Sequence, residues 1–289
     1  MANGGVPTNW GRWGDDDEMG TLHLIDAAAR ARAAAEVRSA RHVSLARMVD
    51  PVPFAGGGPV GVGTAMPAAV LQAMNFTGVP PMAMTDTLVI NTHNAALTHL
   101  DAVSHVPLGD KVYPGVPLGA AVTAGGVRHG SSNVFGAGIL TRGVLLDLAP
   151  GGRLGPECRV QGADLDEAVQ RADTDVHSGD AVVVRGGWDL NRPMGQPVPG
   201  LSLDAVGWLH DHGVSLYLGD IGDARPWAPP LPVHQVALAR LGMPLVDLTA
   251  VDELADVCRD EQRHSFMLVL APPRISGATG LPVNPIAIF

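Results

Sequence analysis

Histidine and aspartate gather in one short stretch of the chain, residues 93–105. The odd-numbered positions there hold His93, His99, Asp101 and His105. Alternate side chains of a β-strand point to the same face, so the stretch predicts one strand face that carries these groups. His99 and Asp101 would lie about 7 Å apart along it, a span that a metal ion bridges. We therefore expect a metal site, with His105 beyond the strand end and within reach of a water molecule on the ion.

The same residues also allow a metal-free interpretation, in which half-buried polar side chains hydrogen-bond to the backbone. Burying an imidazole beside a carboxylate is costly without a ligand that compensates for the lost hydration. That cost favours a metal site at His99 and Asp101. The β-prone run Thr-Leu-Val-Ile at 87–90 supports a strand that enters the motif.

Two residues outside this stretch have types and positions that suit metal binding. His234 follows a proline-rich loop at the predicted start of a helix, from which an imidazole can point into a cleft. Asp247 ends a predicted strand, and carboxylates at strand ends of α/β folds lie where active sites form. Taken alone, each residue is equally compatible with a structural role. The sequence contains no G-x-x-x-x-G-K-[ST] phosphate loop and no G-x-S-x-G nucleophile turn.

Strand and helix patterns alternate through the second half of the chain. Helical runs, two of them with Asp26 and Ser202 as N-cap candidates, are predicted at 24–37, 164–172, 203–213, 233–241 and 252–260. Apolar runs bounded by turn residues predict strands at 43–49, 143–148, 180–185, 214–218, 244–248 and 266–270. This alternation predicts an α/β fold.

No internal repeat and no linker divides the chain, so we predict a single domain over residues 1–289. Residues 1–20 form an N-terminal arm with Trp10 and Trp13, which either cover a pocket or anchor the terminus to the body. Residues 51–84 are rich in Pro, Gly, Ala and Met with little periodicity, which predicts a long loop that covers a site.

The composition indicates a chain with a sizeable core and many turns. Hydrophobic residues make up 46% of its 289 positions, and it has 36 glycines and 24 prolines. A formal net charge of −10 without a basic cluster argues against nucleic-acid binding. No apolar run approaches the ~20 residues that span a bilayer, and no signal-peptide pattern opens the chain, so we expect a cytoplasmic protein. The two cysteines, Cys158 and Cys258, lack the spacing of a cysteine zinc site.

The run T-H-L-D-A-V-S-H at 98–105 resembles the T-H-x-D-x-x-x-H signature of the metal-dependent cyclase family, which includes bacterial kynurenine formamidases and isatin hydrolases. Nearly the whole chain resembles this family, since further segments follow in the family's order and spacing. They are W-G-R-W-G at 10–14, Y-P-G at 113–115, G-D-A-V-V-V-R at 179–185, P-V-H-Q at 232–235 and G-L-P-V-N-P at 280–285. The resemblance implies the family's fold, a single domain with a mixed sheet or barrel-like core.

The resemblance also implies a role for each matching residue. His99 and Asp101 correspond to metal ligands on the central strand, and in two-metal members this aspartate bridges both ions. His234 corresponds to a further ligand, and Asp247 falls where many members have a glutamate ligand. His105 corresponds to the histidine that donates and accepts the proton.

Three of the chain's departures from the family pattern concern the predicted metal site. The fuller pattern is H-x-G-T-H-x-D-x-P-x-H, and its first histidine corresponds to Ala95 while its glycine corresponds to Leu97. Aspartate instead of glutamate at Asp247 shortens the reach of that carboxylate by one methylene. These departures favour one bound ion, Zn²⁺ or Mn²⁺, over two. His93 is a candidate replacement ligand on the same predicted face, although roughly 20 Å of extended chain would separate it from His99.

These residues predict a metal-dependent hydrolase. A divalent ion held by imidazole and carboxylate lowers the pKa of bound water toward 7 and polarises a carbonyl, so an amide, lactam or lactone would be cleaved with His105 moving the proton. The missing histidine at Ala95 motivates an alternative, a non-hydrolytic cyclase, lyase or dehydratase with an altered or lost metal site. A third hypothesis is a metal-free binding protein.

The substrate is expected to be a small, cyclic or aromatic molecule. By resemblance, Trp10 or Trp13 corresponds to the N-terminal aromatic residue that lines the family's substrate pocket. Few aromatic residues are available for stacking, mainly Trp10, Trp13, Trp188, Trp227, Phe76 and Tyr113. Apolar residues within 51–84 and the acidic composition are consistent with a homodimer or homotetramer, in which one subunit completes the site of another.

Overall fold

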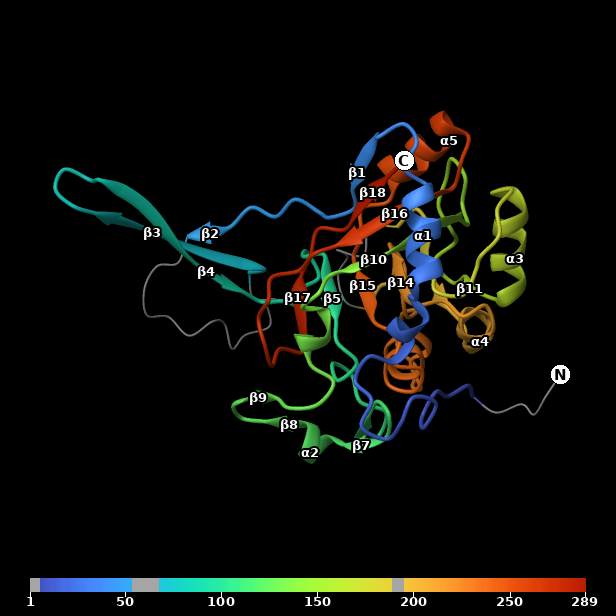
Figure 1. The fold of residues 1–289 in the computed structure, drawn as a ribbon, viewed down its shortest axis with the longest axis horizontal. Helices are drawn as coiled ribbons and strands as arrows, with labels where there is room; N and C mark the ends of the chain where they lie inside the picture. Colours follow the sequence, from blue (N-terminus) through green and yellow to red (C-terminus); the bar gives the residue numbers. More distant parts are fainter. Residues whose placement is uncertain (1–5, 54–67, 189–194) are drawn as a thin grey trace.

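The computed structural model describes residues 6–53, 68–188 and 195–289, which are built around a nine-stranded mixed sheet (Figure 1). The order across this sheet is β1 (His42–Ser44), β18 (Ile286–Ile288), β16 (Ser265–Leu270), β10 (Ile139–Asp147), β12 (Ala181–Arg185), β14 (Leu216–Gly219), β15 (Leu245–Asp247), β5 (His99–Asp101) and β17 (Gly280–Pro282). Strands β10, β12, β14 and β15 run parallel, and all other neighbours pair antiparallel. The predicted α/β class with a mixed sheet is confirmed.

The helices form where the sequence provides caps and apolar periodicity. The described chain contains α1 (Ala27–Ala35), α2 (Leu118–Ala121), α3 (Gly162–Arg171), α4 (Leu203–Asp211), α5 (Asp252–Glu261), two short 3₁₀ turns (Gly20–Leu24 and Ser132–Phe135) and a π-helix (Pro232–Leu238). The predicted N-caps are confirmed, because Asp26 accepts a hydrogen bond from the Ala29 amide and Ser202 accepts one from the Ala205 amide. Where an ordinary helix was predicted over 233–241, the chain forms the π-helix instead.

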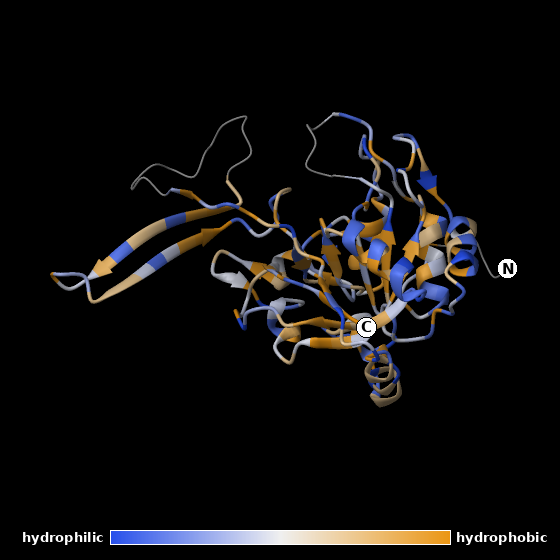
Figure 2. Cartoon of the chain, turned by 90° about the horizontal axis from the view of Figure 1, so that it is seen from above, coloured by the Kyte–Doolittle hydropathy of each residue, from blue (hydrophilic) through white to orange (hydrophobic). Residues whose placement is uncertain are grey.

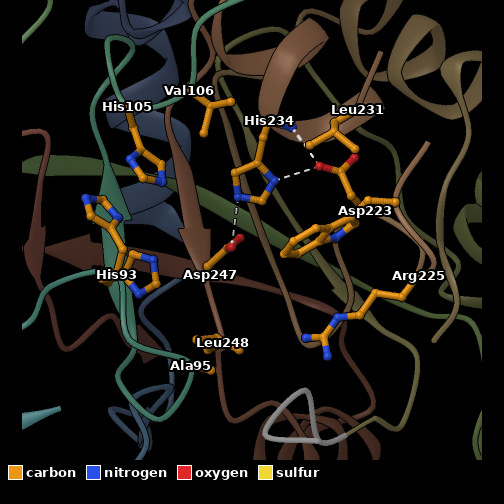
Figure 3. Close-up of a pocket in the computed structure, with 13 residues that line it drawn as sticks. His93, Ala95, His105, Val106, Asp223, Arg225, Leu231, His234, Asp247 and Leu248 are labelled. Carbon is orange, nitrogen blue, oxygen red and sulfur yellow. Dashed lines mark hydrogen bonds and ion pairs between the residues drawn. The ribbon is translucent and has the colours of Figure 1, made fainter. Parts of the chain in front are cut away.

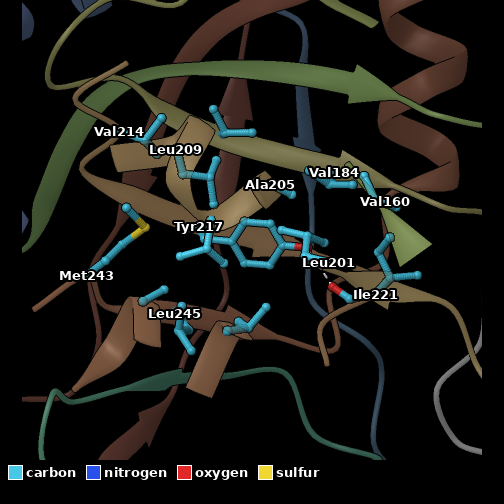
Figure 4. Close-up of a cluster of buried hydrophobic side chains, with 14 of the residues drawn as sticks. Val160, Val184, Leu201, Ala205, Leu209, Val214, Tyr217, Ile221, Met243 and Leu245 are labelled. Carbon is cyan, nitrogen blue, oxygen red and sulfur yellow. Dashed lines mark hydrogen bonds between the residues drawn. The ribbon is translucent and has the colours of Figure 1, made fainter. Parts of the chain in front are cut away.

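The core lies on both faces of the sheet, as expected for strands with continuous apolar runs. Along β10, Val144 and Leu146 belong to one buried cluster and Leu145 to the other, so successive side chains alternate between the faces. One cluster surrounds Tyr217, whose hydroxyl donates to the Ile221 carbonyl at 2.7 Å (Figure 4). Burial raises the pKa of Tyr217 well above its usual value, so this phenol is a structural donor.

Short paired strands lie outside the main sheet. They are β6 (Lys111–Val112) with β7 (Val116–Pro117), β8 (Val122–Thr123) with β9 (Gly126–Val127), and β11 (Arg159–Val160) with β13 (Gly200–Leu201). The predicted strand over 43–49 is wrong in length, because β1 ends at Ser44. No helix in the described ranges is both long and apolar enough to cross a bilayer.

A three-stranded arm projects from the body (Figure 1). It consists of β2 (Val52–Pro53), β3 (Val70–Thr77) and β4 (Ala83–Ile90), with β3 and β4 paired antiparallel over eight residues each. The long covering loop predicted over 51–84 is therefore wrong for the described part of that range, and its positions 54–67 lie outside the described residues. The error has a physical cause: an arm that packs on no core shows no burial periodicity in its sequence.

Candidate metal centre

Strand β5 carries two side chains that can bind a metal, His99 and Asp101, and its neighbour β15 carries a third, Asp247. It lies between β15 and β17, and Asp247 stands directly opposite His99 in the antiparallel register. Opposed residues of paired strands share a face, as do alternate residues of one strand. His99, Asp101 and Asp247 therefore project from the same face of the sheet, and β5 is buried throughout.

Hydrogen bonding orients the imidazole of His99. Its Nδ1 lies 2.7 Å from the Leu97 carbonyl oxygen, which can only accept, so Nδ1 carries the proton. The unprotonated Nε2 is thereby directed toward Asp101, whose Oδ1 lies 3.4 Å away. A ring nitrogen held in this way by a backbone carbonyl is the usual outer contact of a metal-bound histidine.

His234 is oriented in the same manner by a carboxylate that the sequence analysis did not single out. Its Nδ1 lies 2.7 Å from Asp223 Oδ2, and its Nε2 lies 3.1 Å from Asp247 Oδ2 and 3.7 Å from Asp101 Oδ2 (Figure 3). Asp223 also accepts from the amides of Val233 and His234, which fixes the first turn of the π-helix. Burial lowers the pKa of His234, but the adjacent carboxylates outweigh it and raise this pKa well above its usual value.

The chain before β5 does not continue as a strand. Residues 91–98 form turns, so the prediction of one extended strand face from His93 to Asp101 is wrong. The turns fold His93 back over the site, and its Nδ1 lies 3.0 Å from Asp101 Oδ1. The roughly 20 Å separation from His99 expected for an extended chain is therefore also wrong, since the two ring centroids are 5.0 Å apart.

His105 follows β5 and lies against these groups. Its ring stacks on His93 with centroids 3.6 Å apart and planes 4° from parallel, and its centroid is 6.2 Å from that of His234. Burial is the main cause that lowers the pKa of His105, to about 4, although the Asp101 carboxylate opposes it. Its neutral form has a nitrogen that can accept a proton.

The buried carboxylate of Asp101 is the centre of the site. Its side chain is fully buried, yet within the described ranges neither oxygen receives a hydrogen bond. An ionised carboxylate without such partners is costly to bury unless a cation compensates it. Donor atoms of His99, Asp101 and Asp247 lie within 4.8 Å of one another, and so do those of His93, Asp101 and His105. Imidazole and carboxylate are donors that suit Zn²⁺ or Mn²⁺, so the residues present fit a divalent ion.

These groups open into a cavity of about 390 Å³ (Figure 3). The lining residues are His93, Ala95, His99, His105, Val106, Gly222, Asp223, Arg225, Trp227, Leu231, His234, Asp247 and Leu248. Histidine and carboxylate side chains line the cavity together with apolar side chains such as Val106, Leu231 and Leu248. Cavities of this size accommodate small organic molecules.

Comparison with known proteins establishes the family. The Cyclase family model, described as “Putative cyclase”, matches residues 54–224. The chain belongs to the Cyclase family. A solved structure described as a novel cyclase superposes with a TM-score of 0.82 at 29% identity, covering 98% of this chain and 99% of that one. No curated protein matches this cyclase-family chain in sequence.

More distant solved structures share the fold of this cyclase-family protein. An isatin hydrolase bound to the product analogue thioisatinate has a TM-score of 0.61 at 18% identity, covering 89% of this chain and 94% of that one. A protein described as a potential metal-dependent hydrolase with cyclase activity has a TM-score of 0.51 at 14% identity, covering 86% and 98%.

The two N-terminal tryptophans lie away from the cavity of this cyclase-family chain. Trp10 donates its indole N–H to the Ala239 carbonyl at 2.9 Å and packs against Gly115, while Trp13 lies against His23. Neither is among the residues that line the cavity, and the anchoring alternative fits their contacts, while the expected contact with substrate stays a prediction.

Several residues that line the cavity were not identified as site residues from the sequence. Asp223 follows β14 within the run G-D-I-G-D, and the carboxyl end of a parallel strand was the available signal. Trp227 was considered only as one of several aromatic residues. Arg225 had no signal, because its approach to the cavity depends on the path of the loop after β14.

Proposed function

We propose that this cyclase-family protein is a metal-dependent hydrolase that cleaves an amide, lactam or lactone bond in a small cyclic or aromatic substrate. The observation that carries the proposal is the fully buried Asp101 carboxylate, which receives no hydrogen bond from the described residues and lies among imidazole nitrogens. The hydrolase names of two solved structures with the same fold support it.

His99, Asp101, His234 and Asp247 would hold the ion, Zn²⁺ or Mn²⁺. The bound ion would supply Lewis-acid polarisation of the scissile carbonyl and lower the pKa of water. The Leu97 carbonyl and the Asp223 carboxylate keep one nitrogen of His99 and of His234 turned toward the centre. Four protein donors suffice for one ion.

His105 would act as the proton carrier. Its side chain faces the same cavity as His234 and Asp247 (Figure 3). As a neutral imidazole it would accept a proton from the attacking water and return it to the leaving nitrogen or oxygen. Its stacking on His93 restricts the ring, which keeps this nitrogen in place during transfer.

The cavity wall favours a flat and largely apolar substrate. Val106, Leu231 and Trp227 line it together with the polar groups, and the indole of Trp227 offers a stacking surface. Arg225 adds a positive charge to the wall. A cyclic amide, an N-acylated aromatic amine or an aryl ester fits this combination.

Elemental analysis of the purified protein tests the proposal. We expect one or two equivalents of Zn or Mn, loss of turnover with a chelator, and its return when the metal is restored. The substrate panel should contain lactams, N-formylanilines and aryl esters. Protein expressed with added metal that carries none, or turnover that survives complete removal of metal, would contradict the proposal.

A non-hydrolytic cyclase, lyase or dehydratase is the second candidate, and Ala95 favours it because a ligand histidine of the family is missing there. Reaction in oxygen-18 water separates the two. A hydrolase incorporates the label into its acid product, whereas a dehydratase or lyase product formed by elimination contains none.

We also propose that the arm of β3 and β4 joins two copies of this chain, as a dimer or as part of a tetramer. Met74, Phe76, Met84 and Leu88 lie on one face of the hairpin together with Gln72 and Asp86, and each of the four apolar side chains is at least half exposed. Figure 2 shows the hairpin extending from the body, with hydrophobic residues along both of its strands. A two-stranded hairpin is marginally stable alone in water, and its outer strand β4 has neither lysine nor proline to block edge pairing. Residues 68–92 contain one charged side chain, Asp86, so two arms can meet without strong repulsion.

A further inference from the structure

A second cavity, of about 320 Å³, lies at the carboxyl ends of the parallel strands β12, β14 and β15. Gly187, Asp220 and Thr249 line it, and each follows one of these strands by one or two positions. Among the described residues, the two cavities have no lining residue in common. Loops at this edge of a parallel sheet are where α/β folds bind ligands.

The hydroxyl of Thr249 is a buried polar group that faces this cavity. The residue is 1% exposed, and its Oγ1 has no hydrogen-bond partner within the described ranges. Its backbone is fixed, because its amide donates to the Gly219 carbonyl at 3.2 Å. Leu248 has a φ of 62°, which ends the strand alternation, so Thr249 lines the second cavity whereas Asp247 lines the first. A buried hydroxyl without a partner is costly, which favours a polar ligand here.

The amino-terminal end of helix α5 borders the same cavity. Val251 precedes the helix, and its apolar side chain cannot cap the first amides. The helix has ten residues, so the partial positive charge at this end attracts an anion. Asp252 and Glu253 in the first turn are exposed, and Asp252 already pairs with Arg185 at 2.7 Å. The end of α5 therefore adds amide donors to the cavity.

Two arginines bring positive charge to the cavity. Arg47 and Arg153 line it, and the guanidinium of Arg153 lies 5.5 Å from the ring centroid of Trp188. Asp220 is a buried carboxylate in the lining, but its oxygens accept hydrogen bonds from the Gly186 and Trp188 amides at 2.6 and 2.9 Å. Its charge is thus compensated by the protein itself. Guanidinium groups pair with anions, phosphate above all, and disfavour a metal cation.

We propose that this second cavity binds the phosphate group of a small phosphate monoester. Two guanidinium groups, the Thr249 hydroxyl and the amides of α5 supply donors from separate segments, which suits a tetrahedral phosphate better than a planar carboxylate. A cavity of about 320 Å³ leaves room for a small organic group beside the phosphate. The site lies apart from the metal centre and is independent of the proposed hydrolase activity.

Isothermal titration of the full chain with inorganic phosphate and with glycerol phosphate tests the site. We expect both to bind, and acetate to bind at least about ten-fold more weakly. Arg153→Gln and Thr249→Val should each lower phosphate affinity about ten-fold, through loss of one hydrogen bond to a charged group. The matched control, Arg128→Gln, removes an exposed arginine that does not line the cavity and should leave the affinity unchanged. Absence of phosphate binding, equal affinity for acetate, or unchanged affinity in both cavity variants would overturn the proposal.

Two further variants test the hydroxyl and the location of the bound phosphate. Thr249→Ser keeps the hydroxyl and should retain the affinity that Thr249→Val loses, whereas equal losses would contradict a role for the hydroxyl. His99→Ala alters the metal centre and should leave phosphate binding intact. Loss of binding in His99→Ala, with binding retained in the cavity variants, would show that phosphate binds at the metal centre and that the proposal is wrong. Circular dichroism verifies that each variant is folded.

Discussion

Two consecutive segments of this protein, the β3–β4 hairpin of the arm at 70–90 and the site segment at 91–105, have opposite environments. Every residue of β4 is exposed, whereas every residue of β5 is buried. Both are strands, and both contain residues that favour strands. The difference lies in their neighbours: among the described strands β5 pairs on both edges, with β15 and β17, whereas β4 pairs with β3 alone.

The comparison shows what burial does to similar side chains. Asp86 on the arm is exposed and accepts a hydrogen bond from Gln72 at 3.0 Å. Asp101 on β5 is fully buried and accepts none from the described residues. Water compensates the first charge, and a bound cation would compensate the second. The proposed partner chain would cover the apolar surface of the arm, and the proposed metal ion would compensate the buried charge at the site.

Replacing the buried carboxylate should have the largest effect. We expect Asp101→Asn to lower zinc affinity by more than about 100-fold and to abolish turnover, because this carboxylate lies between His99 and His234 at the centre of the proposed ligands. Asp86→Asn is the matched control on the arm and should change neither. Isothermal titration with Zn²⁺ measures the affinities. Equal zinc affinity in the two variants would show that the buried carboxylate of Asp101 has no special role in metal binding.

Removal of the proton carrier should affect catalysis more than metal binding. We expect His105→Ala to lower kcat by about 10² to 10⁴-fold, as for loss of a general base. Bound metal, measured by elemental analysis, should remain close to that of the unchanged chain. If the metal is lost as well, His105 is a ligand and the proposed role is wrong.

Polar substitution on the arm should act on association alone. We expect Phe76→Ser with Met84→Ser to weaken self-association by on the order of 100-fold, since each buried apolar side chain contributes roughly 1.5–3 kcal/mol. Sedimentation velocity measures this, and Ile275→Ser is the control because it removes an exposed apolar side chain from the body. A chain that is monomeric without any substitution would refute the proposed interface.

The smallest effects should separate the tryptophan at the cavity from the one at the N-terminus. Trp227→Ala should raise KM about ten-fold through loss of a stacking surface, with little change in stability. Trp10→Ala should lower the free energy of unfolding by roughly 2 kcal/mol and leave KM unchanged, because its ring is partly buried against the body. Denaturant unfolding and steady-state kinetics provide both values. A KM increase in Trp10→Ala would instead indicate that Trp10 contacts the substrate.

Local sequence patterns predicted the structure correctly where it depends on the residues of a single helix or strand. Asp26 and Ser202 cap their helices as predicted, since a cap depends on residues three positions apart. The continuous apolar run at 180–185 forms the buried strand β12 for a similarly local reason. Strand alternation predicted that His99 and Asp101 share a face, whereas the convergence of His234 and Asp247 with them was expected only through family resemblance.

Contacts between distant segments decided the rest. Asp223 became the partner of His234 because the loop after β14 passes the first turn of the π-helix, which no spacing within either segment reveals. Trp10 anchors the terminus because a backbone carbonyl at Ala239 accepts its indole N–H.

The amino-acid sequence by itself determined the α/β class, the helix caps and the set of histidines and aspartates available for a metal. These depend on propensity, periodicity and side-chain chemistry, all of which act over a few residues. Only the tertiary structure decided that 70–90 leaves the body as an exposed arm and that His93 turns back to Asp101. Both outcomes depend on which strands pair across the sheet and on the space that Gly280 leaves for the His93 ring, and such contacts arise only after distant segments have met.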